Sequence, residues 1–201
     1  TEIAEPGATT TLAYNANGDR IRETEVLTDG TTLLTAYRYD REDRLVGVTK
    51  SLSDSVAITV TMVATYTYDG YGRRAVKEVV EYTPVMTTTG VPTFTQHAVR
   101  MTYLYDGLDI IGVTLEANAT VTENTYYLAP SPVTGMRRPL EMERLPNADT
   151  GFAGDRYWYQ LDGLDSVVAL TDESGDLASP LLYDEYGQML AGITELQVFA
   201  Y

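Results

Sequence analysis

Apolar and polar side chains alternate along much of the chain with a period of two residues, which is typical of β-strands with one buried face. The pattern is clearest between residues 59 and 68, where threonines occupy one face and only Val63 interrupts them. The opposite face of this segment consists of Val60, Met62, Ala64, Tyr66 and Tyr68. No segment shows a sustained apolar stripe with the 3.6-residue period of a helix. The pattern therefore predicts an all-β fold with little helix.

A short tyrosine-rich unit recurs along the chain, and it explains why there are 16 Tyr against three Phe and one Trp. Both rings of a Tyr-x-Tyr pair point to the same face of a strand, and the aspartate that follows favours a turn. We therefore interpret the recurring residues as structural. These predicted repeat positions are Tyr14, Tyr37, Tyr39, Asp40, Tyr66, Tyr68, Asp69, Gly72, Tyr103, Tyr105, Asp106, Tyr157, Tyr159, Asp162, Tyr183, Asp184 and Gly187.

Each unit predicts a β-hairpin, because a second β-rich run follows the turn residues. We expect the Asp-Gly pairs at 69–70, 106–107 and 162–163 to supply the positive φ that tight hairpin turns need. A series of such units gives tandem antiparallel hairpins. We expect them to form one β domain over residues 1–201.

The segment 130–156 interrupts this rhythm with four prolines and three glycines. Proline is confined largely to edge strands and bulges in a sheet, so we predict a Pro/Gly-rich insertion loop here. The segment also contains Arg137 and Arg138, a basic pair that is unusual in so acidic a chain.

The charge and composition of the chain exclude several functions. Fourteen Lys and Arg against 29 Asp and Glu give a net charge of −15, which disfavours binding to nucleic acid or to an anionic membrane. No apolar run is long enough to cross a bilayer. The absence of cysteine excludes disulfides and thiolate ligands, and the single histidine excludes a multi-histidine metal site. We expect no cofactor and no metal site of high affinity.

The repeat resembles that of the Rhs or YD-repeat proteins, which include the C components of insecticidal toxin complexes and the extracellular region of teneurins. Their unit, Tyr-x-Tyr-Asp-x-x-Gly-Arg-Leu, is matched by residues 66–73, and by residues 37–45 with Asp43 at the glycine position. Residues 161–175 resemble the stretch before the conserved core of bacterial Rhs proteins. Gln160 stands there at the usual histidine position and Asp165 at the glycine. The resemblance covers the chain from Tyr14 to Tyr201.

The resemblance implies a β-ribbon that coils into part of a hollow shell or barrel. In toxin-bearing members of the family, the shell encloses a C-terminal toxic domain until delivery. The core segment with the aspartates that are linked to self-cleavage would begin after Tyr201. We therefore expect no catalytic residue in this chain. The alternating residues 196–201 and the start at Thr1 lead us to expect a fragment of a longer protein.

Two further sequence signals have simpler structural explanations. His97 lacks a neighbouring nucleophile and an orienting partner, both of which a catalytic base would require. Asn15, Asn17 and Asp19 imitate the first ligands of a calcium loop. The glycine and the closing glutamate of such a loop are missing, so we interpret these residues as a hairpin turn. Whether a weak calcium site exists there is left open by the sequence.

These observations predict a structural, non-enzymatic protein that forms part of the wall of a β-shell, which in the full-length protein encloses a C-terminal effector or toxin domain. The expected partners are neighbouring repeats of the same longer chain, a second copy that pairs through edge strands, and the enclosed domain. We expect a secreted or cell-surface location. The alternative is a cell-surface adhesion or glycan- or protein-binding module, with the tyrosines as a stacking platform. A hydrolase would need carboxylates that converge in a cleft, whereas these lie mostly at turns.

Overall fold

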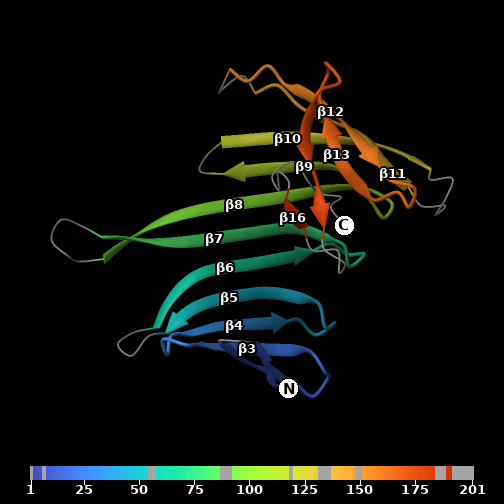
Figure 1. Cartoon of the computed structure of the whole chain (residues 1–201). Helices are drawn as coiled ribbons and strands as arrows, with labels where there is room; N and C mark the ends of the chain where they lie inside the picture. Colours follow the sequence, from blue (N-terminus) through green and yellow to red (C-terminus); the bar gives the residue numbers. More distant parts are fainter. Residues whose placement is uncertain are drawn as a thin grey trace. The chain divides into compact units, whose positions relative to one another are not determined.

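The computed structural model describes residues 2–5, 8–53, 58–86, 92–117, 120–130, 137–147, 151–183 and 189–191 (Figure 1). These residues form strands and turns, and none of them lies in a helix, so no helix of the described residues could span a membrane. The strands are β1 (Glu2–Glu5), β2 (Ala8–Tyr14), β3 (Arg20–Leu27), β4 (Thr32–Tyr39), β5 (Leu45–Ser53), β6 (Ile58–Tyr68), β7 (Arg74–Met86), β8 (Pro92–Asp106), β9 (Asp109–Ala117), β10 (Thr120–Pro130), β11 (Arg137–Arg144), β12 (Asp155–Leu161), β13 (Val167–Thr171), β14 (Leu177–Pro180), β15 (Leu182–Tyr183) and β16 (Met189–Ala191). The prediction of an all-β fold is confirmed.

Strands that are neighbours in the sequence are also neighbours in the sheet. Strands β1 to β14 follow one another in chain order, and β15 pairs with β16 in a separate two-stranded sheet. The first hairpin pairs Glu2 with Thr11 in antiparallel register, and the β13–β14 hairpin pairs Ala169 with Pro180 in the same way. These are the tandem antiparallel hairpins that the repeat predicts.

The contacts within the chain group into two units. Unit 1 comprises Thr1–Thr102 and Glu116–Ala119, and unit 2 comprises Tyr103–Leu115 and Thr120–Tyr201. We expected a single domain from the repeat, and the repeat itself contains no signal for this division.

Unit 1 buries few side chains. Among its described residues only Gly47, Val48, Ser51 and Ala64 are buried, and all four lie on β5 and β6. Val48 and Ala64 are cross-strand partners in this pair. Because burial of apolar side chains is the main source of stability in most domains, this unit depends more than usual on its strand ladders and on its turns.

Unit 2 has the larger core. Two rows of cross-strand partners contribute to it, namely Tyr126, Met142 and Tyr157, and then Tyr159, Leu170 and Ser179. The side chains of Met142 and Leu170 are completely buried. Burial of one such side chain contributes about 1.5–3 kcal/mol relative to an exposed position.

The prediction of an insertion loop over residues 130–156 is wrong for its central part. Residues 137–144 form β11, which pairs with both β10 and β12 and so lies inside the sheet. Pro139 is buried opposite Leu128, next to a register shift that leaves Leu140 without a partner on β10. A bulge interrupts the regular hydrogen bonding of the ladder, so a neighbouring residue does not need to donate an N–H. This proline is therefore tolerated in a central strand. Residues 131–136 and 148–150 lie outside the described part of the chain.

Candidate functional site

The repeat produces a row of similar turns along one end of unit 1. These turns cover residues 15–19 between β2 and β3, 40–44 between β4 and β5, and 69–73 between β6 and β7. They lie at the same end of the strands because each is separated from the next by one complete hairpin. Figure 1 shows this end at the right of unit 1. We call these three segments the turn row, and it is the candidate functional site for a structural role.

The turn that begins at Asp69 shows the geometry of the unit. The main-chain N–H of Asp69 donates to the carbonyl of Arg73 at 2.9 Å, and the N–H of Gly72 donates to the carbonyl of Asp69 at 3.0 Å. Oδ1 of Asp69 accepts the N–H groups of Tyr71 and Arg73, both at 2.9 Å. Oδ2 accepts Nε–H of Arg73 at 2.7 Å. One carboxylate therefore caps the turn and holds the arginine that follows it.

Four other turns have the same hydrogen bonds. In each of them, the side-chain oxygen of the first residue accepts the N–H groups two and four positions later, at 2.8–3.0 Å. These first residues are Asn15, Asp40, Asp162 and Asp172. A short side chain with an oxygen that can reach its own backbone is needed here. This requirement explains why the aspartate of the unit recurs.

The residue with positive φ is the fourth of each turn, so two of the sequence predictions were wrong. Gly70 and Gly163 do not have a positive φ, whereas Gly107 does, at 61°, as predicted. The fourth residues of the five turns are Gly18, Asp43, Gly72, Asp165 and Gly175. The Asp-Gly pair does not mark the residue with positive φ in these two turns. The side-chain cap of the first residue, rather than a two-residue turn, determines the backbone conformation.

We expect Gly72→Ala to destabilise the protein by about 1–2 kcal/mol, because a Cβ is disfavoured in the left-handed region. The matched control is Gly70→Ala in the same turn, where φ is not positive and no atom lies within 4 Å of the added Cβ. We expect that variant to be neutral or slightly stabilising. Urea denaturation of the two variants measures the difference. Equal losses in both would contradict the assignment of the turn geometry.

Tyrosine side chains connect successive turns of the row. The hydroxyl of Tyr39 donates to the carbonyl of Arg20 at 3.1 Å, and that of Tyr68 donates to the carbonyl of Leu45 at 2.8 Å. Arg20 and Leu45 are the first residues of β3 and β5, directly after the preceding turn of the row. The guanidinium of Arg44 also lies over the ring of Tyr68, 4.8 Å from its centroid. The second tyrosine of the unit thus holds its own hairpin to the one before.

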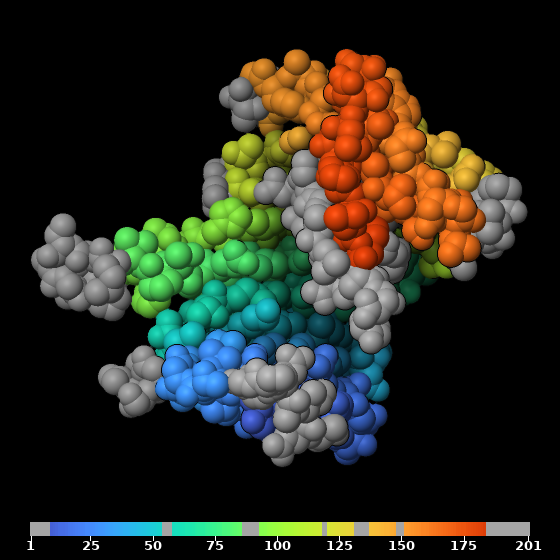
Figure 2. All heavy atoms as spheres, viewed as in Figure 1, coloured from blue at the N-terminus to red at the C-terminus, as the bar shows by residue number. Residues whose placement is uncertain are grey.

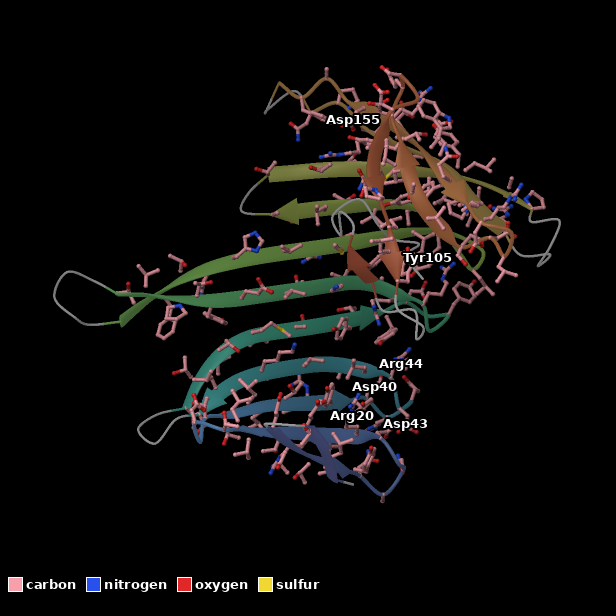
Figure 3. All side chains as sticks on the ribbon, in the orientation of Figure 1. Arg20, Asp40, Asp43, Arg44, Tyr105 and Asp155 are labelled. Carbon is pink, nitrogen blue, oxygen red and sulfur yellow. The ribbon has the colours of Figure 1, made fainter. Side chains whose placement is uncertain are left out.

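The two aspartates with positive φ form bonds that a glycine could not make. Oδ1 of Asp43 accepts the side-chain amide of Asn17 at 2.9 Å, which joins the first two turns of the row. In unit 2, Oδ1 of Asp165 accepts Nη1–H of Arg138 at 3.0 Å. Figure 3 shows Asp43 beside Arg20, Asp40 and Arg44 at the turn end of unit 1. At each of these two positions an aspartate therefore takes a conformation that favours glycine and gains a contact with a distant segment.

The basic pair Arg137 and Arg138 has a structural role in unit 2. Arg137 forms ion pairs with Asp106 at 3.2 Å and with Asp109 at 3.5 Å, while Arg138 binds Asp165. Both arginines belong to β11, the strand that we predicted to be a loop. They therefore tie β11 to the turns at 106–109 and 162–166.

Three of the turn carboxylates, those of Asp40, Asp69 and Asp162, have a lowered pKa, which favours their charged form. Main-chain N–H groups of Ser166 and Leu164 lower the pKa of Asp162 below its ordinary value of 3.8. At Asp40, desolvation acts to raise the pKa, but hydrogen bonds from Arg44 and from the N–H of Glu42 outweigh it and the pKa is lowered. The pKa of Asp69 is lowered in the same way, by Arg73 and the N–H of Tyr71.

Stability is therefore expected to fall at acidic pH. Because these pKa values are lowered by folding, the stabilisation is fully present above the ordinary value, about 4, and is lost as the pH falls through the folded-state pKa. We expect Tm to change little between pH 7 and 5 and to drop between about pH 4 and 3. Thermal melts followed by circular dichroism test this, at low protein concentration because the pI is 4.3. Asp162→Asn, which keeps the accepting oxygen, should show a smaller drop, and a Tm independent of pH down to 3 would contradict the cause.

The other predicted positions have varied environments. In unit 1, Tyr37 donates to Glu23 at 3.1 Å, Tyr66 lies under the guanidinium of Arg74, and Tyr14 is 48% exposed. In unit 2, Tyr159 is buried, and Tyr157 donates to Asp155 at 2.8 Å. Tyr103, Tyr105 and Tyr183 are half-buried and Asp106 is exposed. Asp184 and Gly187 lie outside the described residues.

The structure gives the candidate calcium residues a role in the turn. Oδ1 of Asn15 accepts the N–H groups of Asn17 and Asp19, and its side-chain amide donates to Asp19 at 2.8 Å. His97 is exposed and lies opposite Glu81 in the β7–β8 ladder. Within the described ranges, no group of three or more His, Cys, Asp or Glu is placed to hold a metal ion.

Sequence reasoning missed the ion pairs of the turn row and the buried polar residues of unit 2. The sequence does contain a signal for the ion pairs, because Asp40–Arg44 and Asp69–Arg73 share a spacing of four residues. Asn124 and Tyr126 are both buried on β10, and burial raises the pKa of the Tyr126 hydroxyl well above its ordinary value. Neither residue belongs to the repeat, and we find no sequence signal that marks them.

Comparison with solved structures gives distant likenesses. No known protein family matches the sequence, and no curated protein does either. A Photorhabdus luminescens Tc holotoxin pore structure is similar at 14% identity with a TM-score of 0.33, over 88% of this chain and 10% of that one. A porin-like protein from Bacteroides uniformis is similar at 12% identity with a TM-score of 0.23, over 92% of this chain and 89% of the other. The chain spans about a tenth of the matched Tc chain.

Proposed function

We propose that this chain is a structural wall segment, built of tandem hairpins that the turn row binds together, and that it is not an enzyme. The observation that carries the proposal is the repeated link from a tyrosine hydroxyl to the preceding hairpin, at Tyr39 and Tyr68. The charged and hydroxyl groups of this site are used in capping, in ion pairs and in ring contacts. Such groups build a surface, whereas catalysis requires convergent groups with a place for a substrate.

The finer proposal concerns the whole protein. As part of a longer chain that is secreted or displayed at the cell surface, the segment would line a β-shell that encloses a C-terminal effector domain. A shell wall suits the composition of the repeat. A tyrosine ring packs against its neighbours while its hydroxyl reaches a carbonyl or water at a wet face, as the Tyr68 hydroxyl does at Leu45.

Protease protection tests the enclosure. The complete open reading frame is expressed, and limited proteolysis is followed by mass spectrometry of its C-terminal region. Enclosure predicts that this region resists digestion until the wall is unfolded with urea, and that electron microscopy shows an internal cavity. A freely digestible C-terminal region without a cavity would refute enclosure and favour an adhesion module.

The isolated chain should self-associate through its edges. Strands β1 and β14 stand at the two ends of the strand order, and an edge strand exposes unpaired N–H and C=O groups. We expect dimers or larger species by light scattering, with a fraction that increases with salt because the chain carries a net charge of −15. Monomers at every concentration and ionic strength would contradict edge pairing.

A further inference from the structure

The ladder between β6 and β7 ends before either strand does. Its last pair is Met62 with Glu81. Beyond it, residues 58–60 of β6 pair only with β5, and residues 82–86 of β7 pair only with residues 92–96 of β8, within the described part of unit 1. Figure 1 shows β6 bending away from β7 at this point. We call residues 82–86 and 92–96 the arm, and among the described residues the facing edges of the arm and of β6 form no ladder pair.

A hollow of about 550 Å³ lies between the diverging strands. It is lined by Ile58, Thr59, Val60, Tyr82, Phe94 and Gln96. Ile58 is 71% exposed, Phe94 46% and Val60 41%, so large apolar surfaces face solvent here. A volume of this size falls within the range of about 300–1,000 Å³ that ligand sites occupy. Figure 2 shows the arm projecting past β6.

The lining segments are free of charge in a chain that is 21% charged. No Asp, Glu, Lys, Arg or His occurs between Asp54 and Asp69, or between Glu81 and His97. The nearest ion pair on the arm strands joins Arg100 to Glu78 at 2.6 Å, so each of these two charges already has a partner. The nearest acidic and basic side chains along β7 and β8, Glu81 and His97, are cross-strand partners at the base of the arm, so a charged group centred on the hollow would face only apolar and uncharged polar side chains. The lining therefore selects an uncharged occupant.

We propose that the hollow is a docking site for an extended, uncharged peptide segment of a partner protein, which adds as a strand between β6 and the arm. Two unpaired edges that flank an apolar hollow offer both parts of strand addition: main-chain hydrogen bonds give affinity, and pockets for alternate side chains give specificity. The apolar side chains of such a segment would cover Ile58, Val60 and Phe94. This site goes beyond the wall function, because the turn row takes no part in it.

Pro84 defines how the segment binds. It has no N–H and lies on the arm strand opposite Phe94. A proline on a strand is compatible with an edge position, and it removes one donor from the ladders of that strand. We therefore expect the apolar hollow to supply a substantial share of the affinity beside the remaining hydrogen bonds. Substitution of a lining side chain should consequently have a large effect.

Calorimetric titration of the 201-residue chain with the capped peptide Thr-Val-Thr-Val-Thr-Val-Thr tests the proposal. Val60→Glu places a carboxylate in the hollow and should weaken binding at least about tenfold. The matched control is Val85→Glu, because Val85 is 42% exposed against 41% for Val60 and lies on the opposite face of the arm from Phe94. It should bind within about twofold of the unchanged chain. Circular dichroism of both variants confirms that they fold.

Three further probes separate strand addition from other occupants. A peptide with glutamates in place of the valines, and one with a central proline, should both fail to bind. Cellohexaose, a neutral saccharide, should neither bind nor compete. Equal effects of Val60→Glu and Val85→Glu, binding of the charged peptide or of cellohexaose, or no binding of the uncharged peptide would each overturn the proposal. If the unliganded chain forms a dimer and Val60→Glu abolishes that dimer, a second copy of the chain occupies the hollow. This result would overturn the proposal as well.

Discussion

Replacement of Leu170 by alanine is expected to lower the free energy of unfolding by about 2–5 kcal/mol, the usual cost of this change in a packed core. Leu170 is completely buried on β13, between its cross-strand partners Tyr159 on β12 and Ser179 on β14. Both partners are nearly buried, at 6% and 1% exposure, so neither can easily move into the space that the leucine leaves. The truncation should therefore leave a cavity and cost more than the lost transfer free energy alone.

The single tryptophan makes this measurement specific. Trp158 lies on β12 in unit 2, so its fluorescence during urea denaturation reports the unit that contains Leu170. Leu177→Ala on β14 is the matched control, because Leu177 is 62% exposed and its truncation should change stability by no more than about 0.5 kcal/mol. Equal losses in the two variants would show that the Tyr159–Leu170–Ser179 row is not a packed core.

Replacement of Asp69 should separate the two roles of its carboxylate. Asp69→Ala removes the acceptor of two main-chain N–H groups and the partner of Arg73, and we expect it to lower Tm by several degrees. Asp69→Asn keeps the first role, as Asn15 demonstrates in the equivalent turn, where its Oδ1 accepts the corresponding N–H groups. The asparagine variant should lose less than half as much, because a partly exposed ion pair contributes little.

Thermal melts of the wild type and both variants measure these losses. If the asparagine variant melts as early as the alanine variant, the ion pair with Arg73 is the stabilising part and the cap is not. Arg73→Gln provides the complementary measurement, because it removes the ion pair together with the contact of the guanidinium over the Tyr71 ring, 5.2 Å from its centroid. It should lose at least as much as Asp69→Asn and less than Asp69→Ala.

The strand order could be predicted from the sequence because the repeat combines two local signals. Alternation locates a strand such as residues 59–68, and an aspartate at its end locates the turn. Every paired neighbour is also adjacent in the chain, so no long-range pairing had to be guessed. The division into two units could not be predicted, because it reflects how contacts between residues group along the whole chain and not the local period.

The details of the turns and of β11 were harder to predict for physical reasons. At Gly70 the Asp-Gly rule failed, because the Asp69 carboxylate binds two N–H groups and moves the positive φ to Gly72. At Pro139 the rule against proline failed, since the bulge at Leu140 and the ion pairs of Arg137 and Arg138 secure a strand with poor intrinsic propensity. In both cases side-chain contacts outweighed local preference.

The order of the hairpins also has a kinetic consequence. A sheet whose strands pair in chain order has a low contact order, and such topologies reach their native contacts with little loop-closure entropy. Each hairpin can close on a microsecond scale as soon as its two strands are available. The Tyr68 hydroxyl can then join Leu45 on the hairpin formed just before it. We therefore expect this chain to fold from its N-terminus onward during synthesis, each finished hairpin serving as the template for the next.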